Sequence, residues 1–197
     1  MTATTSVTQS ATLRRALITR QTLTSHLSLV ITGVLFLAAM AQISIPVPGS
    51  PVPVTGQTLA ALLLGTAYGA GLGFTTFTAY IAIGVAGAPF FAHGSHGVHV
   101  ITGATGGYLV GMLLASTLTG ALAGRRWDQK IITVIPTMLI GTISTFTFGL
   151  IWLHHSTAQS WSWTISKGLT PFLFGEFLKI AIASTALPSL WQFISRP

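Results

Sequence analysis

The sequence predicts an all-α integral membrane protein with six transmembrane helices, and three features support this prediction. Half of the 197 residues are hydrophobic and only 6% are charged, whereas a soluble domain carries about a quarter charged residues. The stretch 21–124 contains no Lys, Arg, Asp or Glu, which leaves room for four spans of about 20 residues. The basic residues are confined to a few short segments, as expected for loops between spans.

The amino-terminal part divides into a polar segment, 1–24, and the start of a membrane-embedded domain, 25–195. The first span is expected at 27–43, although this apolar run followed by Ala39-Met40-Ala41 also resembles a signal peptide with its cleavage site. Prolines interrupt 45–53, because they remove backbone donors and restrict the residues before them. The second span is expected at 57–68, a glycine-rich turn at 69–73, and the third span at 74–86.

The carboxy-terminal half adds three further spans, at 104–123, 131–153 and 169–191. Residues 87–103 are rich in Gly and His and are expected to be irregular, which is tolerated in a membrane only where protein or a cavity covers them. A charged loop is expected at 124–130 and an outer loop at 154–166. Glycines at four-residue spacing permit close helix contacts, either inside the protein or with a partner subunit: Gly65, Gly69 and Gly73; Gly103, Gly107 and Gly111; Gly120 and Gly124.

The distribution of basic residues predicts the orientation. Six spans place both termini on one side of the membrane, and seven of the nine basic residues then fall on that side: Arg14, Arg15, Arg20, Arg125, Arg126, Lys130 and Arg196. Because cytoplasmic loops carry an excess of Lys and Arg, both termini are predicted to be cytoplasmic in a multi-pass protein of the cell membrane. The net charge of +7 therefore indicates membrane orientation, and no nucleic acid partner is expected.

The last span contains two charges, Glu176 and Lys179, and Glu176 is one of only two acidic residues in the chain. A charge at the centre of a bilayer costs about 2.5–3.5 kcal/mol on insertion scales, so intramembrane charges usually mark functional sites. Residues three apart lie on one face of a helix. The two side chains can therefore form a structural ion pair between helices, or both can face a bound ligand.

Other polar and aromatic residues lie within apolar spans and could complete a small-molecule pocket. Each of them also has a simpler explanation as packing or an interhelical hydrogen bond, but together with the charge pair they predict a substrate-binding site: Gln57, Thr58, Tyr80, Phe91 and Tyr108. His93, His96 and His99 have a spacing that could hold zinc, but no acidic residue lies near them in sequence. The chain has no phosphate-binding Gly-x-x-x-x-Gly-Lys-Ser/Thr loop.

Four segments, in order, resemble the biotin transporter family BioY. They are 41–48 with 52–59, Gly87-Ala88-Pro89-Phe90-Phe91-Ala92, Gly103-Ala104-Thr105-Gly106-Gly107-Tyr108, and 171–179. The last is similar to the family motif Pro-x-x-x-Gly-Asp-x-x-Lys, with Glu176 where the family usually has Asp. The third has Ala104 in place of the family's Pro.

The resemblance implies a six-helix, outward-facing biotin-binding subunit, the S component of an energy-coupling factor (ECF) importer. Its partners would be a transmembrane coupling protein and two ATPase subunits. ATP would be used by the partners, and this chain itself would need no cofactor and would not be an enzyme.

The chemistry of biotin suits the charge pair in two ways. Glu176 can accept the ureido N–H groups while Lys179 donates to the ureido carbonyl, or Lys179 can bind the valerate carboxylate. Two other functions stay open: a self-sufficient facilitator or proton-coupled carrier that uses Glu176, and a small membrane enzyme that uses the histidine-rich loop.

Overall fold

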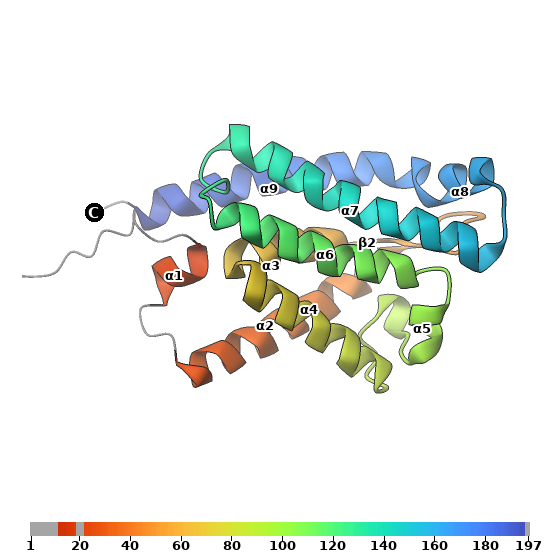
Figure 1. Ribbon diagram of the computed structural model, residues 1–197, viewed down its shortest axis with the longest axis horizontal. Coiled ribbons are helices and arrows are strands. Elements are labelled where there is room, and N and C mark those ends of the chain that lie inside the picture. Colours follow the sequence, from red (N-terminus) through yellow and green to blue (C-terminus); the bar gives the residue numbers. More distant parts are fainter. Residues whose placement is uncertain (1–11, 19–21, 196–197) are drawn as a thin grey trace, which may run out of the picture.

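The computed structural model describes residues 12–18 and 22–195, and the long helices lie side by side along one axis (Figure 1). Most of the predicted segment 1–24, together with Arg20 and Arg196, lies outside the described residues. The lengthwise helices follow the order of the predicted spans: α2 (Leu23–Gln42), α3 (Gln57–Tyr68), α4 (Ala70–Val85), α6 (Gly106–Ala123), α7 (Ile131–Thr157) and α9 (Leu173–Ile194).

The two ends of the bundle differ in their short elements. One end, called here the hairpin end, carries the antiparallel pair β1 (Ser44–Ile45) and β2 (Val54–Thr55), with η2 (Ala92–Gly94), α5 (Val98–Thr102), α8 (Trp161–Gly168) and η3 (Thr170–Phe172). The other end, the basic end, carries α1 (Leu13–Leu17) and the loop 124–130 (Figure 1). Its described basic residues are Arg14, Arg15, Arg125, Arg126 and Lys130.

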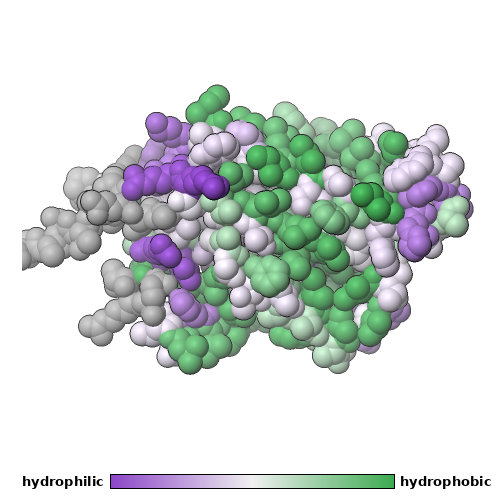
Figure 2. Space-filling view, viewed as in Figure 1, coloured by the Kyte–Doolittle hydropathy of each residue, from purple (hydrophilic) through white to green (hydrophobic). Residues whose placement is uncertain are grey.

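The surface is that of a multi-pass membrane protein. Apolar side chains cover the middle of the bundle and hydrophilic ones gather toward its two ends (Figure 2). Large apolar side chains are highly exposed, including Ile132 at 77% and Phe193 at 75%, which would be unfavourable in water. Within the described residues, four helical stretches are long and apolar enough to cross a bilayer: Leu23–Gln42, Gly106–Ala123, Ile131–Thr157 and Trp161–Ile194. Helices α3 and α4, with 12 and 16 residues, are shorter than these.

Several predicted boundaries are wrong for identifiable reasons. The turn predicted at 69–73 is confined to Gly69, which has a φ of +83°, and α4 is already helical from Ala70. Part of the predicted outer loop is the helix α8, because Ser160 caps it by accepting a hydrogen bond from the Trp163 N–H. The proline-rich stretch 45–53 lies in the connection of a small antiparallel hairpin between β1 and β2. This hairpin was not part of the predicted all-α fold.

Five of the eight spaced glycines lie at contacts inside the bundle. A side chain at Gly107 would meet Trp152 and the Phe148 carbonyl of α7, and one at Gly111 would meet the backbone of Thr145. Glycines 65, 73 and 120 are similarly close to other parts of α3, α4 and α6. These positions allow the helix backbones to approach closely. The spacing therefore reflects packing within the bundle, and these glycines do not form an open docking face.

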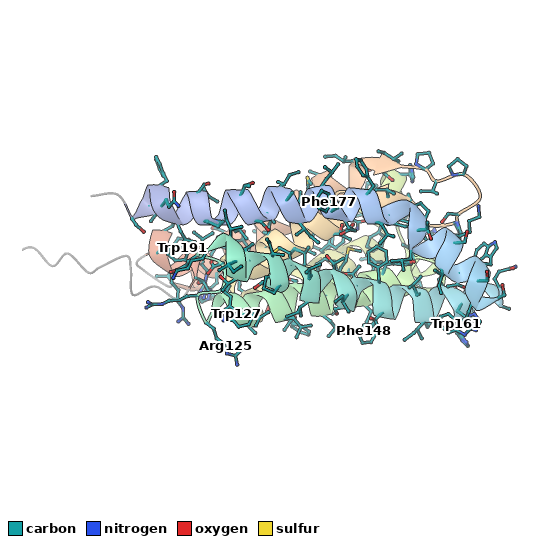
Figure 3. All side chains as sticks on the ribbon, turned by 90° about the horizontal axis from the view of Figure 1, so that it is seen from above. Arg125, Trp127, Phe148, Trp161, Phe177 and Trp191 are labelled. Atoms are coloured by element: carbon teal, nitrogen blue, oxygen red, sulfur yellow. The ribbon has the colours of Figure 1, made fainter. Side chains whose placement is uncertain are left out.

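The second acidic residue, Asp128, joins the loop 124–130 to the last helix. Its side chain is fully buried, and its Oδ2 accepts a 2.7 Å hydrogen bond from the Trp191 indole N–H. Trp127 and Trp191 lie near one another at the basic end (Figure 3). Burial raises the pKa of Asp128 to about 6, and the hydrogen bond from Trp191 opposes this shift. The folded protein therefore favours the protonated carboxyl more than the unfolded chain does.

We expect the protein to be more thermally stable at pH 5 than at pH 7, and Asp128→Asn to weaken this dependence. Because the folded-state pKa is raised, the folded protein binds the extra proton between about pH 4 and 6, and stability falls as pH rises through this window. The expected change in melting temperature between pH 5 and pH 7 is about 2–4 °C. Thermal melts in detergent measure it. The same slope in wild type and Asp128→Asn would exclude Asp128 as its source.

Candidate functional site

A cavity of about 270 Å³ lies at the hairpin end, between the bundle helices and the loops that connect them. Its lining combines apolar and aromatic side chains with a few polar groups, as is typical of small-molecule sites. The walls come from 51–58, 91–95, α5, α6, α7, η3 and α9. The lining residues are Pro51, Val52, Pro53, Thr55, Gln57, Thr58, Phe91, Ala92, His93, Ser95, Val100, Thr105, Tyr108, Leu109, Met112, Phe146, Phe172, Glu176 and Lys179.

Glu176, Lys179 and Thr58 form a compact polar triad in the wall of this cavity. Lys179 Nζ lies 2.6 Å from Glu176 Oε1 and 2.6 Å from Thr58 Oγ1, and the Thr58 hydroxyl donates to Glu176 Oε1 at 2.9 Å. The spacing of three residues on α9 allows the ion pair. Thr58 comes from α3, so the triad also joins the first turn of that helix to α9.

The triad leaves hydrogen-bonding capacity for a ligand. The second carboxylate oxygen, Glu176 Oε2, is buried and has no hydrogen-bond partner among the described residues. A buried acceptor without a partner is costly, especially on a charged group. Lys179 has three N–H donors, of which two are used within the triad. Glu176 Oε2 can therefore accept a hydrogen bond from a ligand, and Lys179 can donate one remaining N–H to it.

The local sequence before α3 positions the polar groups of its first turn. The Gln57 backbone N–H donates to Thr55 Oγ1, and the Thr55 hydroxyl donates to Gln57 Oε1. The Gln57 side-chain amide then donates to the Tyr80 hydroxyl at 2.7 Å. Because both ends of the Gln57 amide are held, α3 begins in a defined register and Thr58 faces the charge pair.

Tyr80, expected from the sequence to bind substrate, lies behind Gln57 and outside the cavity wall. Its side chain is fully buried, and its hydroxyl donates to the Phe90 carbonyl at 3.0 Å. Its ring meets the edge of the Phe91 ring with centroids 5.5 Å apart. Phe91 packs over Gly84, where any side chain would clash with the phenyl ring. Tyr80 thus supports two parts of the cavity wall, at Gln57 and Phe91.

An aromatic cluster forms another part of the wall. Tyr108 of α6 and Phe172 of η3 stack at 6.4 Å with an interplanar angle of 26°, and Phe146 of α7 meets both rings edge-on. The Tyr108 hydroxyl donates to the Gly168 carbonyl at 2.8 Å, so its polar end is satisfied. The rings therefore present an apolar, rigid surface to a ligand.

Apart from Tyr80, the structure brings all of the predicted binding residues together around this cavity. Sequence reasoning missed several apolar lining residues, of which Phe146, Phe172 and Met112 are the largest. Two of these could have been found from helical spacing: Phe172 is four residues before Glu176, and Met112 is four residues after Tyr108. No such spacing points to Phe146, which comes from a helix without any predicted site residue.

The three histidines of the 87–103 segment are separated in the structure. His93 lines the cavity, with its Nε2 3.3 Å from Ser44 Oγ, and has a φ of 58°. Neither His96 nor His99 is among the lining residues. Within residues 12–18 and 22–195, no three His, Cys, Asp or Glu side chains are grouped so as to hold a metal ion.

A protein-family model matches residues 7–196, which is almost the entire chain. The chain belongs to the BioY family. This confirms the resemblance found in the four sequence segments. One BioY relative, the biotin transporter BioY2 of Lactococcus lactis subsp. cremoris (strain MG1363), is 32% identical over 158 residues, which cover 80% of this chain and 85% of the relative.

Other similar proteins agree with this BioY assignment. The probable biotin transporter BioY of Pyrococcus horikoshii is 31% identical over 158 residues, covering 80% of this chain and 91% of that protein. The crystal structure of the S-component for biotin from an ECF-type ABC transporter superimposes with a TM-score of 0.77. It covers 88% of this chain and 96% of the solved chain at 22% identity, and this likeness shows a shared fold.

Proposed function

We propose that this chain is the biotin-binding subunit of an ECF-type importer, which captures biotin outside the cell and delivers it to the cytoplasm. The observation that carries the proposal is the unpartnered Glu176 Oε2 beside Lys179, inside a cavity of a BioY-family chain. The membrane-embedded domain is assigned to 25–195 and the polar amino-terminal segment to 1–24.

The proposed topology has six membrane crossings with both termini in the cytoplasm. The lengthwise helices reverse direction at each connection (Figure 1), and the described basic residues gather at one end, as the positive-inside rule predicts for the cytoplasmic side. The short helix α3 can complete a crossing because the hairpin before it covers the same end of the bundle. The cavity then lies toward the outer surface.

The unpaired acceptor favours one pose of biotin over the other. The ureido ring has two N–H donors and a carbonyl, whereas the valerate is an anion with no donor. Glu176 Oε2 can accept a ureido N–H, and the remaining Lys179 N–H can donate to the ureido carbonyl. Valerate at Lys179 would bring a second carboxylate beside Glu176, which is electrostatically unfavourable. We therefore propose that the ureido ring contacts the triad and the valerate lies farther away.

Partner subunits supply the energy in this proposal. The sequence has no phosphate-binding loop, so ATP would be bound and hydrolysed by two ATPase subunits that act through a transmembrane coupling protein. Support comes from the solved S-component of an ECF-type ABC transporter, which shares the fold. The relatives are named as transporters, and we propose no enzymatic activity.

Purification without added ligand, followed by mass spectrometry, tests which molecule the cavity holds. We expect biotin to be retained, and expect a Lys179→Ala variant purified in parallel to retain none. Retention of a different molecule, lost in the same variant, would contradict the proposed substrate and leave the site in place.

Uptake into liposomes separates the ECF subunit from a self-sufficient carrier. We expect the chain alone to bind biotin without accumulating it, and accumulation to appear only with the coupling protein, the ATPases and internal ATP. Accumulation by the chain alone, driven by a proton gradient and lost in Glu176→Gln, would support the carrier instead.

Replacing Tyr80 with Phe tests the support behind the cavity wall. The change removes the acceptor for the Gln57 amide and the donor to the Phe90 carbonyl, so we expect a destabilisation of about 1–2 kcal/mol. Biotin affinity should fall about three- to ten-fold because Gln57 and Phe91 are less firmly held. Calorimetry and thermal melts measure the two effects. The matched control is Tyr68→Phe, whose hydroxyl donates to the Leu29 carbonyl away from the cavity; it should leave affinity unchanged.

A further inference from the structure

A second cavity, of about 390 Å³, lies at the basic end and has no role in the proposed biotin site. It is an open cavity bordered by α1, the turn from α3 into α4, and the end of α6. Thr12, Arg14 and Arg15 line it from the α1 side, and residues 68–72 line it from the side of the turn. Leu13, which is 5% exposed and packed in an apolar cluster with α3, α7 and α9, holds α1 against the bundle.

The start of α4 offers free backbone donors to this cavity. Gly69, with a φ of +83°, lies between α3 and α4. Because glycine has no side chain, it does not cap the start of α4. The first backbone hydrogen bond of α4 is donated by Gly73, so the N–H groups of Ala70, Gly71 and Leu72 have no partner within the helix. No acidic residue lies in the first turn. Such a helix start attracts anions.

An independent observation on α1 also points to a ligand. Thr12 is 5% exposed and lines the cavity, yet its hydroxyl has no hydrogen-bond partner among the described residues and does not cap α1. The Nε of Arg14 is buried without a partner as well. A buried polar group without a partner is unfavourable. A bound group with several oxygen atoms would satisfy the hydroxyl, the guanidinium and the amides together.

Arg14 and Arg15, which line this cavity, have no acidic partner within the described part of the chain. The chain has two acidic residues, of which Glu176 pairs with Lys179 and Asp128 bonds to Trp191. Among residues 12–18 and 22–195, neither Arg14 nor Arg15 forms a salt bridge with a carboxylate. Desolvation and the nearby Arg15 charge lower the pKa of Arg14. Its Nη1 lies 3.4 Å from His26 Nε2, so the guanidinium contacts another side chain but no carboxylate.

We propose that this cavity binds a phosphate group, held by Arg14, Arg15, the Thr12 hydroxyl and the free amides at the start of α4. Guanidinium groups and helix amino termini are the usual protein ligands of phosphate oxygens. The group can belong to an anionic phospholipid or to a soluble phosphate compound. An exposed apolar side chain on α1 favours the phospholipid, since Leu17, two residues after Arg15 on that helix, is 65% exposed.

Thermal melts of the full chain in detergent test the proposal with three probes. These are mixed micelles containing phosphatidylglycerol, the same micelles with phosphatidylcholine, and inorganic phosphate. We expect phosphatidylglycerol to raise the melting temperature saturably and phosphatidylcholine to have no such effect. A response to inorganic phosphate alone would support the same site with a soluble ligand.

Variants assign the response to the cavity. The double variant Arg14→Gln/Arg15→Gln should need about ten-fold more phosphatidylglycerol for the half-maximal shift. Arg125→Gln, which alters an exposed arginine of the same end outside the lining, should respond as the wild type does. Gly71→Asp has open space for its side chain and would add an anion at the start of α4, so it should raise the lipid-free melting temperature and weaken the lipid response.

The proposal is overturned if neither phosphatidylglycerol nor inorganic phosphate shifts the melting temperature, or if phosphatidylcholine, whose phosphate is neutralised by its choline group, shifts it as much as phosphatidylglycerol does. It is also overturned if Arg14→Gln/Arg15→Gln needs the same lipid concentration as the wild type for the half-maximal shift. A loss of response in Arg125→Gln as large as that in the double variant would overturn it too, because the effect would then be one of net charge. Circular dichroism and gel filtration of each variant show that the fold is retained. None of these readouts depends on biotin.

Discussion

Replacing Lys179 with alanine is expected to lower biotin affinity by about a thousand-fold, which abolishes high-affinity binding. The variant loses the proposed donor to the ureido carbonyl and also leaves Glu176 as a buried carboxylate without its ion-pair partner. In binding, truncating one partner of a buried, hydrogen-bonded charge pair costs about 2–5 kcal/mol, and each 1.4 kcal/mol corresponds to a factor of ten. Titration calorimetry in detergent measures the affinity.

Two companion variants make the Lys179 experiment decisive. Lys167→Ala changes a lysine of α8 at the same end that does not line the cavity, and it should bind biotin as the wild type does. The double variant Glu176→Gln/Lys179→Met removes both charges with little change in volume, so it should fold and still fail to bind tightly. Unchanged affinity in Lys179→Ala would show that the pair braces α9 and does not contact biotin.

Glu176→Gln is expected to lower biotin affinity by about 10- to 100-fold. The carboxylate has two acceptor oxygens, of which Oε1 serves Thr58 and Lys179 and Oε2 is free. The amide has one acceptor and one NH₂ donor. In either orientation, the NH₂ group faces a donor, from the triad or from the proposed ureido ring. Such a donor–donor contact leaves buried groups unsatisfied, at about 1–3 kcal/mol.

Comparison with Glu176→Asp separates the effect of the carboxylate charge from the effect of side-chain length. Aspartate keeps both acceptors and the charge, and it is the residue of the family motif that 171–179 resembles, so we expect most of the affinity to remain. Asp128→Asn, which changes the other buried acid at the opposite end, should leave affinity unaltered. Equal affinities in Glu176→Gln and the wild type, measured by calorimetry, would argue against a ureido N–H bond to this carboxylate.

The class of the protein and much of its site could be predicted from sequence because the signals are local. Two charges in an apolar run are visible without any structure, and the helical spacing of Glu176 and Lys179 predicts their ion pair. The start of α3 at Gln57 follows from the prolines before it, since they exclude a regular helix. Thr58 and Tyr108 were predicted as site residues because they are polar residues in apolar spans, and both also lie in the short segments that resemble the family.

Local signals failed where packing outweighs intrinsic preference. Gly71 and Gly73 suggested a turn, but α4 is helical there, and Gly73 packs near Ser116 of α6 where a larger side chain would not fit. Glycine is a poor helix former in isolation, yet small residues stabilise close contacts between membrane helices. Tyr80 was predicted to bind substrate because it is a polar residue in an apolar span, and only the folded structure shows that its hydroxyl bonds to Gln57 behind the cavity wall.

Composition, charge distribution and short motifs were sufficient to identify a BioY-family membrane protein and the charge pair of its last helix, because each depends on residues close together in the chain. The convergence of that pair with Thr58, 118 residues away from Glu176, and the burial of an unpartnered carboxylate oxygen became evident only in the folded protein. So did the cavity between α1 and α4. These features depend on how separate helices pack against one another. The positions of two residues along the chain do not indicate whether their helices will bring them into contact.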